Sequence, residues 1–186
     1  MLLFAHLVGV AVLFGALSIE VFALASLGRA GTVDDVRNAT HLVRYIPVLA
    51  PVATLLLVGS GVWMVTVSDR SSFTTGWVVV SIALTGLLAA AGPTVQGRRI
   101  GRVVALLADA SAARGALLAA ARDATMHVAG WISTAEAFAL LYLMTVKPSL
   151  AGSLLAAGVA VIVGIGVAVA LRSRVPSAAD PVASHE

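Results

Sequence analysis

Apolar residues form five long runs along the chain, and short polar stretches separate them. Each run has on the order of 20 residues, which is the length that an α-helix needs to cross the hydrocarbon core of a bilayer. A helix is the expected element because it satisfies its own backbone hydrogen bonds in a solvent that offers none. The pattern predicts an all-α transmembrane bundle with five spans, at about residues 2–27, 45–67, 76–96, 124–146 and 149–171.

The segment between the third and fourth spans, residues 98–123, has a different pattern. Its apolar residues Ile100, Val103, Val104 and Leu107 recur at helical spacing opposite the arginines. This spacing predicts one amphipathic helix, either on the cytoplasmic membrane surface or as an extension of the third span, with a kink near Pro93. Its basic face suits anionic lipid headgroups.

The connections and the end of the chain complete this organisation. The connections after the second and fourth spans are short, so spans two and three, and spans four and five, are expected to be antiparallel neighbours. We expect one domain over residues 1–171 and a mobile cytoplasmic tail over residues 172–186.

Composition agrees with a membrane protein. Hydrophobic residues make up 60% of the chain, charged residues 11%, and mean hydropathy is +1.02, whereas soluble domains carry roughly 25% charged residues. A soluble enzyme is therefore excluded. The absence of cysteine excludes disulfides, thiolate metal sites and iron–sulfur clusters. The net charge of +3 is too small to indicate a nucleic-acid partner.

Lysine and arginine residues are unevenly divided between the two ends of the predicted bundle. Ten of them fall in the first connection, the third connection and the tail, and two, Arg70 and Lys147, fall at the opposite end. By the positive-inside rule this bias predicts an outside N-terminus and a cytoplasmic C-terminus.

Few ionisable residues lie within the predicted spans, and each is a candidate functional residue because burial of a charge in a membrane is costly. His6, Leu13 and Glu20 share one face of the first span, since seven residues complete almost two helical turns. On the fourth span, His127 and Glu136 fall on opposite faces. Glu20 and Glu136 have a proton, metal or solute role, or they hydrogen-bond to neighbouring helices as structural groups.

The depths of these residues limit how they can combine. A haem held by His6 and His127 is improbable because their depths differ by about 20 Å. Two other arrangements remain: one at the cytoplasmic end with Glu20, His41, Arg44 and His127, and one at the outer end with His6 and Lys147. Imidazole nitrogens bind haem iron, copper and zinc alike. The methionines, Met64, Met126 and Met144, are too sparse for a copper path and are expected to pack in the core.

The fifth span carries small residues at every fourth position. Such a stripe lets two helix backbones approach closely in lipid. It either packs against the fourth or first span or mediates self-association or contact with a membrane partner. The stripe consists of Gly152, Ala156, Ala160, Gly164 and Ala168.

Two stretches resemble a known family. The first span contains Leu3-Phe4-Ala5-His6-Leu7-Val8-Gly9 followed by Phe14-Gly15-Ala16-Leu17, and the fourth span ends in Tyr142-Leu143-Met144-Thr145-Val146-Lys147-Pro148. The early histidine and the Met-x-x-Lys-Pro exit resemble a family of predicted bacterial integral membrane proteins. That family looks related to the copper-resistance-D-like group, which includes membrane protoporphyrinogen oxidase. The resemblance covers about Met1–Pro148.

This resemblance implies that His6 is a haem or copper ligand, with Lys147 as a second candidate. It also implies a bacterial cytoplasmic membrane as the location. Phe14-Gly15 stands where the oxidase pattern has a tryptophan, which argues against porphyrinogen oxidation.

Three functional hypotheses follow. The leading one is an integral membrane protein that binds haem b or copper through an intramembrane histidine for redox or metal handling. The first alternative is a non-catalytic accessory subunit of a larger membrane complex. The second is a small-solute or proton permease that uses Glu20 and Glu136. The sequence does not identify a reaction.

Overall fold

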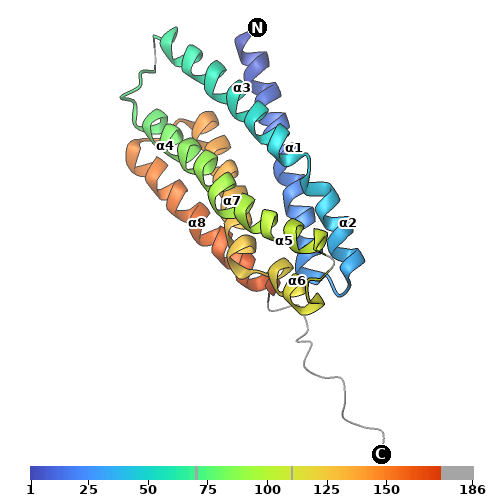
Figure 1. Cartoon of the computed structure of the whole chain (residues 1–186). Helices are drawn as coiled ribbons and strands as arrows, with labels where there is room; N and C mark the ends of the chain where they lie inside the picture. The colour runs from blue at the N-terminus through green and yellow to red at the C-terminus, as the bar shows by residue number, and fades with distance from the viewer. Residues whose placement is uncertain (70, 110, 173–186) are drawn as a thin grey trace, which may run out of the picture.

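The computed structural model describes residues 1–69, 71–109 and 111–172, and they form helices joined by short connections (Figure 1). The described residues contain no strand. In chain order the elements are α1 (Leu2–Arg29), α2 (Val33–Val43), α3 (Ile46–Thr66), α4 (Gly76–Ala91), the π-helix η1 (Gly92–Gly97), α5 (Arg98–Ala108), α6 (Arg114–Ala121), α7 (Ala124–Val146) and α8 (Leu150–Arg172).

The predicted all-α fold with five spans is confirmed. Five helical stretches are long and apolar enough to cross a membrane, and they contain α1, α3, α4, α7 and α8. The predicted tail lies outside the described residues from position 173 onward, as does Arg70.

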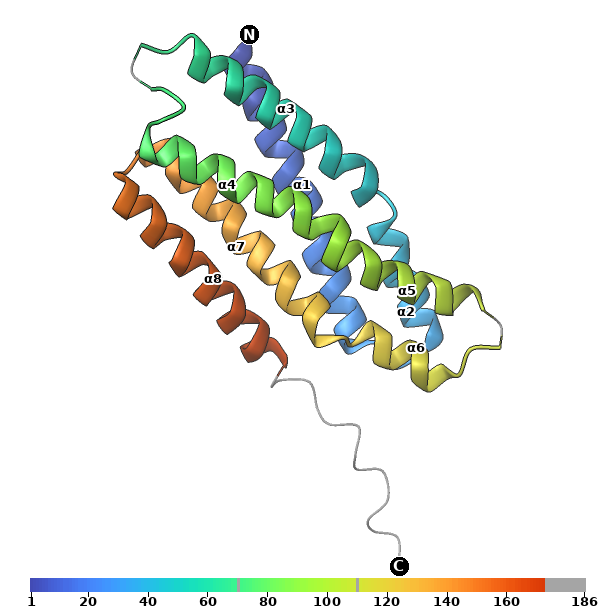
Figure 2. The same cartoon turned by 60° about the vertical axis from the view of Figure 1, so that its left-hand side comes forward.

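The helices pack in an order that differs in one place from the sequence prediction. α3 packs on α1, α1 on α7, and α7 on α8, while α4 packs on both α7 and α8 (Figure 2). The fourth and fifth spans, α7 and α8, are neighbours as predicted. The second and third spans, α3 and α4, were also predicted to be neighbours but do not pack on each other. The reason lies partly in Gly9 of α1, which has no side chain and lets α3 approach: a Cβ atom there would lie 3.0 Å from Leu56 Cβ.

The small-residue stripe of α8 packs within the monomer. Ala160, Gly164 and Ala168 are buried, and α8 packs most extensively on α7. A Cβ atom on Gly164 would lie 2.6 Å from Ile132 Cα. Of the two uses predicted for the stripe, the structure therefore shows packing against the fourth span.

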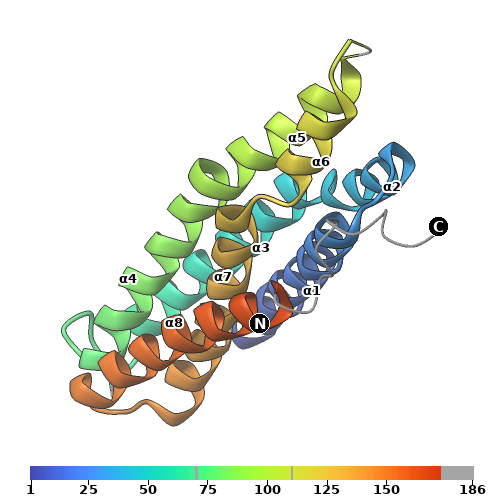
Figure 3. The ribbon, with the colours of Figure 1, turned by 90° about the horizontal axis from the view of Figure 1, so that it is seen from below.

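Three shorter helices, α2, α5 and α6, form what we call the cap, at the end of the bundle away from the N-terminus (Figures 1 and 3). Their apolar faces close over the end of α1 and the start of α7. The shared core consists of Leu24, Leu27, Ala30, Val36, Ala39, Val103, Leu117, Ala121 and Met126.

The cap corrects the prediction of one helix over residues 98–123. The segment forms two helices, α5 and α6, because Asp109 accepts hydrogen bonds from the backbone and hydroxyl of Ser111, at 2.9 and 2.6 Å, and so turns the chain. These bonds also lower the pKa of Asp109 below its usual value. Helix α2 was not predicted, although Thr32 and Asp35 form a capping box at its start.

Arginine side chains form hydrogen bonds between the cap and the backbone at the end of α1. Arg122 donates to the carbonyl of Ala30 and Arg114 to that of Gly31, both at 2.7 Å. Basic side chains stabilise a helix C-terminus because they bond its unpaired carbonyls. Arg99 and Asp123 form an ion pair at 2.5 Å between α5 and the start of α7.

The π-helix η1 joins α4 to α5 without a break, so α5 extends the third span. Pro93 lies at the start of η1. Proline has no N–H to donate to the preceding turn, and this loss favours a local change in helical winding. The widened turn carries Gln96 into the bundle, where it is buried.

The close contact of α8 with α7 generates a stability prediction. Gly164→Leu is expected to destabilise the protein by about 1–3 kcal/mol, because the new side chain meets the backbone of α7. Gly158→Leu is the matched control, since a Cβ atom at Gly158 meets nothing within 4 Å. Unfolding in mixed detergent micelles measures both variants. Equal stabilities would contradict the observed packing of the stripe.

Candidate functional site

His6 is buried in the half of the bundle that holds the N-terminus, where α1, α3 and α7 meet. Its side chain is 8% exposed. Ring atom Nδ1 lies 3.0 Å from Ser60 Oγ of α3, and Nε2 lies 3.4 Å from Met144 Sδ of α7. Gly61 leaves space beside the ring, since a Cβ there would lie 3.6 Å from His6 Cε1. We call His6, Ser60 and Met144 the histidine site.

The hydrogen bonds of Ser60 assign the proton on the imidazole ring. The Ser60 hydroxyl donates its single proton to the backbone carbonyl of Leu56, one turn earlier in α3. Its oxygen is then an acceptor towards His6, so Nδ1 carries the ring proton. In the neutral ring, Nε2 has a lone pair, and that lone pair faces the thioether of Met144.

With the ring proton assigned to Nδ1, Nε2 and Met144 Sδ are two acceptors that lie 3.4 Å apart. A neutral imidazole nitrogen and a thioether sulfur are both acceptors, so they do not bond to each other. Both are ligands of soft transition-metal ions. Met144 was assigned to core packing from the sequence, and the signal that could have found it is the Met-x-x-Lys-Pro exit itself.

A second polar group lies deeper in the bundle, towards the cap, and consists of Glu20, Gln96 and Gly130. Glu20 is 7% exposed and Gln96 is 5% exposed. Glu20 Oε1 and Gln96 Nε2 are both buried without a hydrogen-bond partner. Both lie near Gly130 of α7: a Cβ atom there would be 3.3 Å from Gln96 Nε2 and 3.8 Å from Glu20 Oε1.

The other intramembrane carboxyl, Glu136, is buried in α7 with 2% exposure. It lies six residues from Gly130, which on an α-helix is about a third of a turn away from the face of Glu20. Glu20, which belongs to α1, therefore faces a different side of α7 from the one that carries Glu136.

The predicted convergence of Glu20, His41, Arg44 and His127 does not occur. His41 and Arg44 are exposed on α2 and just after it, and the Arg44 guanidinium stacks 4.6 Å from the ring centre of Tyr45. His127 Nε2 lies 3.3 Å from the carbonyl of Ala121, and the ring packs beside Gly28. His41 and His127 therefore lie in separate places and do not form one site with Glu20.

The predicted meeting of His6 and Lys147 does not occur either. Lys147 ends α7 in a left-handed conformation with φ 52°. Its ammonium lies 5.6 Å from the ring centre of Trp77, at the start of α4. Because Lys147 is exposed and directed at Trp77, it contributes nothing to the histidine site.

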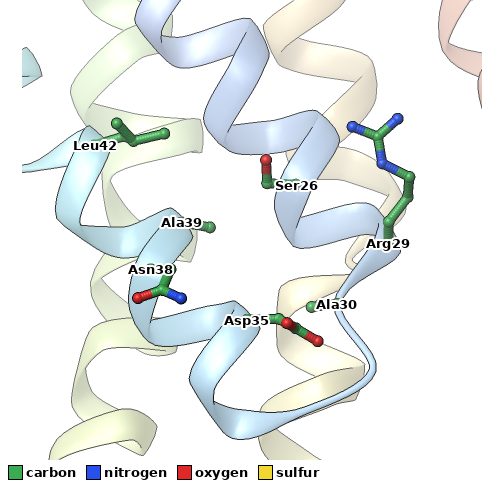
Figure 4. Close-up of a pocket in the computed structure, with 7 residues that line it drawn as sticks. All are labelled: Ser26, Arg29, Ala30, Asp35, Asn38, Ala39 and Leu42. Atoms are coloured by element: carbon green, nitrogen blue, oxygen red, sulfur yellow. The ribbon is translucent and has the colours of Figure 1, made fainter.

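Neither of two hollows on the surface of the described residues is lined by His6, Glu20 or Glu136. The larger, about 380 Å³, lies between the end of α1 and α2 (Figure 4). Its lining residues are Ser26, Arg29, Ala30, Asp35, Asn38, Ala39 and Leu42. The smaller, about 180 Å³, lies between α1 and α7 and includes the edge-to-face ring pair Phe14 and Phe138.

The larger hollow does not form a charged binding site. Asp35 accepts from the backbone N–H groups of Gly31 and Thr32, so its carboxylate is engaged in capping α2. Figure 4 shows the Arg29 side chain directed away from α2. Within the part of the chain that the structure describes, no three His, Asp or Glu side chains form a group able to hold a metal ion.

A family model described as "Predicted integral membrane protein (DUF2269)" matches residues 1–148. The match includes α1 to α7, and with them the histidine site and the Glu20 group, and it ends before α8. No curated protein and no solved structure matches the chain. The resemblance of Met1–Pro148 to a family of predicted integral membrane proteins is confirmed, whereas the relation to the copper-resistance-D-like group stays a prediction.

The hydrogen bonds of Ser60 generate a prediction about the ring of His6. In the metal-free protein at neutral pH, nitrogen-15 NMR should show His6 protonated at Nδ1 and bare at Nε2. His41 is the internal reference, since its exposed ring lacks this hydrogen bond. A ring protonated at Nε2 would contradict the assignment of the proton from Ser60.

Proposed function

We propose that this chain, which belongs to the DUF2269 family of predicted integral membrane proteins, binds one copper(I) ion between His6 and Met144 and handles that metal within the membrane. The observation that carries the proposal is the 3.4 Å contact between Nε2 of the buried His6 ring and the thioether sulfur of Met144. An imidazole and a thioether together favour a soft ion, and copper(I) is a soft ion that thioethers bind well.

The size of the gap supports a single ion. Metal–nitrogen bonds are about 2.0 Å long, so an ion in contact with both atoms needs only a small movement of the methionine. The Met144 side chain has three rotatable bonds and adapts easily. The hydrogen bond from His6 Nδ1 to Ser60 orients the imidazole, as partners of ligating histidines do in metal sites.

A haem does not fit the histidine site. Both ring nitrogens of His6 have a protein atom within 3.4 Å, on Ser60 and Met144. A porphyrin on Nε2 would require Met144 and the helix that carries it to move away. The described contacts therefore favour copper over haem b among the two cofactors that the sequence suggested.

The charge distribution supports a location for this site. We place the cap on the cytoplasmic side, because the arginines of the first and third connections lie in it or next to it. In this orientation His6 lies in the outer half of a bacterial cytoplasmic membrane. Copper then reaches the site from the outside, and the bundle holds it away from cytoplasmic reductants and thiols.

The accessory-subunit hypothesis loses its main support. It depended on the stripe of α8, and that stripe packs on α7 within the monomer. A partner of α8 would have to bind its other face, where Leu154, Leu155 and Ile162 are exposed. Exposed leucine and isoleucine side chains on a spanning helix are also what lipid contact requires.

Copper affinity tests the proposal. The purified full chain in detergent should compete with a chromophoric copper(I) chelator at a stoichiometry of one, and His6→Ala or Met144→Leu should abolish this competition because each removes one of two ligands. Ser60→Ala should weaken affinity by about 10–100-fold through loss of ring orientation.

The chain supplies matched controls for each ligand. His41→Ala removes an exposed histidine, and Met64→Leu removes a methionine of α3 outside the histidine site. Both should bind copper(I) as the wild type does. No competition by the wild type, or equal loss in the controls, would contradict the proposal.

The orientation has its own test, which the cysteine-free chain makes simple. A cysteine at Ser72, between α3 and α4, should react with a membrane-impermeant maleimide in intact cells, and one at Ser111, between α5 and α6, should react only after lysis. Both positions are exposed. The reverse labelling pattern would contradict the proposed orientation.

A further inference from the structure

Glu20, Gln96 and Gly130 form a polar site that the copper proposal does not use. The two side chains come from α1 and η1 and are each more than nine-tenths buried. Glu20 Oε1 and Gln96 Nε2 both lack a hydrogen-bond partner. A buried polar group without a hydrogen-bond partner destabilises the fold, so two such groups next to one glycine require an explanation.

The backbone of two elements creates this site. The π-helix carries Gln96 inward, and single π-helical turns inside α-helices are frequent at functional sites. Gly130 lets α1 and η1 approach α7 closely, because a Cβ atom on it would overlap Leu24 Cδ1 of α1 and would come within 3.3 Å of Gln96 Nε2. A side chain at position 130 would therefore displace Leu24 and press against Gln96, next to the two polar atoms.

The two unpaired atoms are chemically complementary to one kind of ligand. Gln96 Nε2 is a donor and needs an acceptor, and an ionised Glu20 Oε1 is an acceptor and needs a donor. Water both accepts and donates, and buried waters typically bridge such groups. A bare cation would satisfy Glu20 but would face the N–H groups of Gln96.

We propose that Glu20 and Gln96, next to Gly130, hold one water molecule inside the membrane, and that Glu20 exchanges its proton through this water. When Glu20 is a carboxylic acid, its O–H bond breaks as the water oxygen takes the proton, which leaves a carboxylate and a hydronium ion. The reverse step restores the acid. The exchange is independent of copper, since the histidine site lies elsewhere along α1.

No other charged group takes over this role in the surroundings of Glu20. α3, which packs on α1, and η1, which carries Gln96, have no titratable residue in their sequences. On α7 the titratable residues are His127, which packs beside Gly28, Glu136, on another face, and Tyr142, near the end of the helix. Those of α2 are in the cap: Asp34, Asp35, Arg37 and His41.

Infrared spectroscopy of the full chain in lipid vesicles tests the proposal. The carbonyl band of protonated Glu20, identified by its loss in Glu20→Gln, should shift within the dead time when the buffer is changed to D₂O. Gly130→Ala, whose methyl group would displace Leu24 and press against Gln96 Nε2, and Gln96→Leu, which removes the donor, should slow this shift at least tenfold.

Three control variants test whether slower exchange is specific to the surroundings of Glu20. Glu136→Gln and Gly86→Ala should leave the Glu20 band and its exchange unchanged, since a Cβ atom at Gly86 meets nothing within 4 Å. His6→Ala should also leave it unchanged, even though it should abolish copper binding. Gln96→Leu keeps the test valid if Gly130→Ala fails to fold.

Two results would overturn the proposal. If the Glu20 band exchanges equally fast in Gly130→Ala and Gln96→Leu, the water does not bridge these residues. If sodium ions at constant pH remove the protonated band in the wild type, a metal cation occupies the site instead of water.

Discussion

The absence of water from the hydrocarbon core is the constraint on which the rest of the structure depends. A polar group that faces lipid has no partner, so the intramembrane histidine and glutamates must turn inward and find one within the bundle. His6 does so with Ser60 and Met144. Glu20 turns inward too, but its Oε1 atom has no protein partner. The contrast between a partnered and an unpartnered group distinguishes the two sites.

Small residues decide which helices meet, because apolar side chains gain little from leaving lipid for another apolar surface. Gly9 brings α3 onto α1 and thereby Ser60 to His6. Gly130 lets α1 and the π-helix approach α7 and so brings Glu20 and Gln96 to the same glycine. Gly164 holds α8 on α7. The positions of the glycines therefore fix both the packing order and the two polar sites.

Hydrophobic patterning was sufficient to predict the five spans, since length and apolarity alone define them, and it identified His6 and Glu20 as buried. It could not predict that α3 packs on α1 and not on α4, because contact between helices depends on the shapes of their facing surfaces. For the same reason Met144 was assigned to the core, and Gln96 was placed at the end of a span. The helical break at Asp109 was readable from residue type but was missed within a long, alanine-rich segment. The capping box of α2 was equally readable and was missed in the connection after the first span.

The central claim is that one copper(I) ion bridges a nitrogen of α1 and a sulfur of α7. X-ray absorption at the copper edge measures the ligand atoms directly on the copper-loaded protein. The account predicts one imidazole and one sulfur neighbour, with the sulfur signal absent in Met144→Leu. A spectrum with nitrogen and oxygen neighbours only would contradict it.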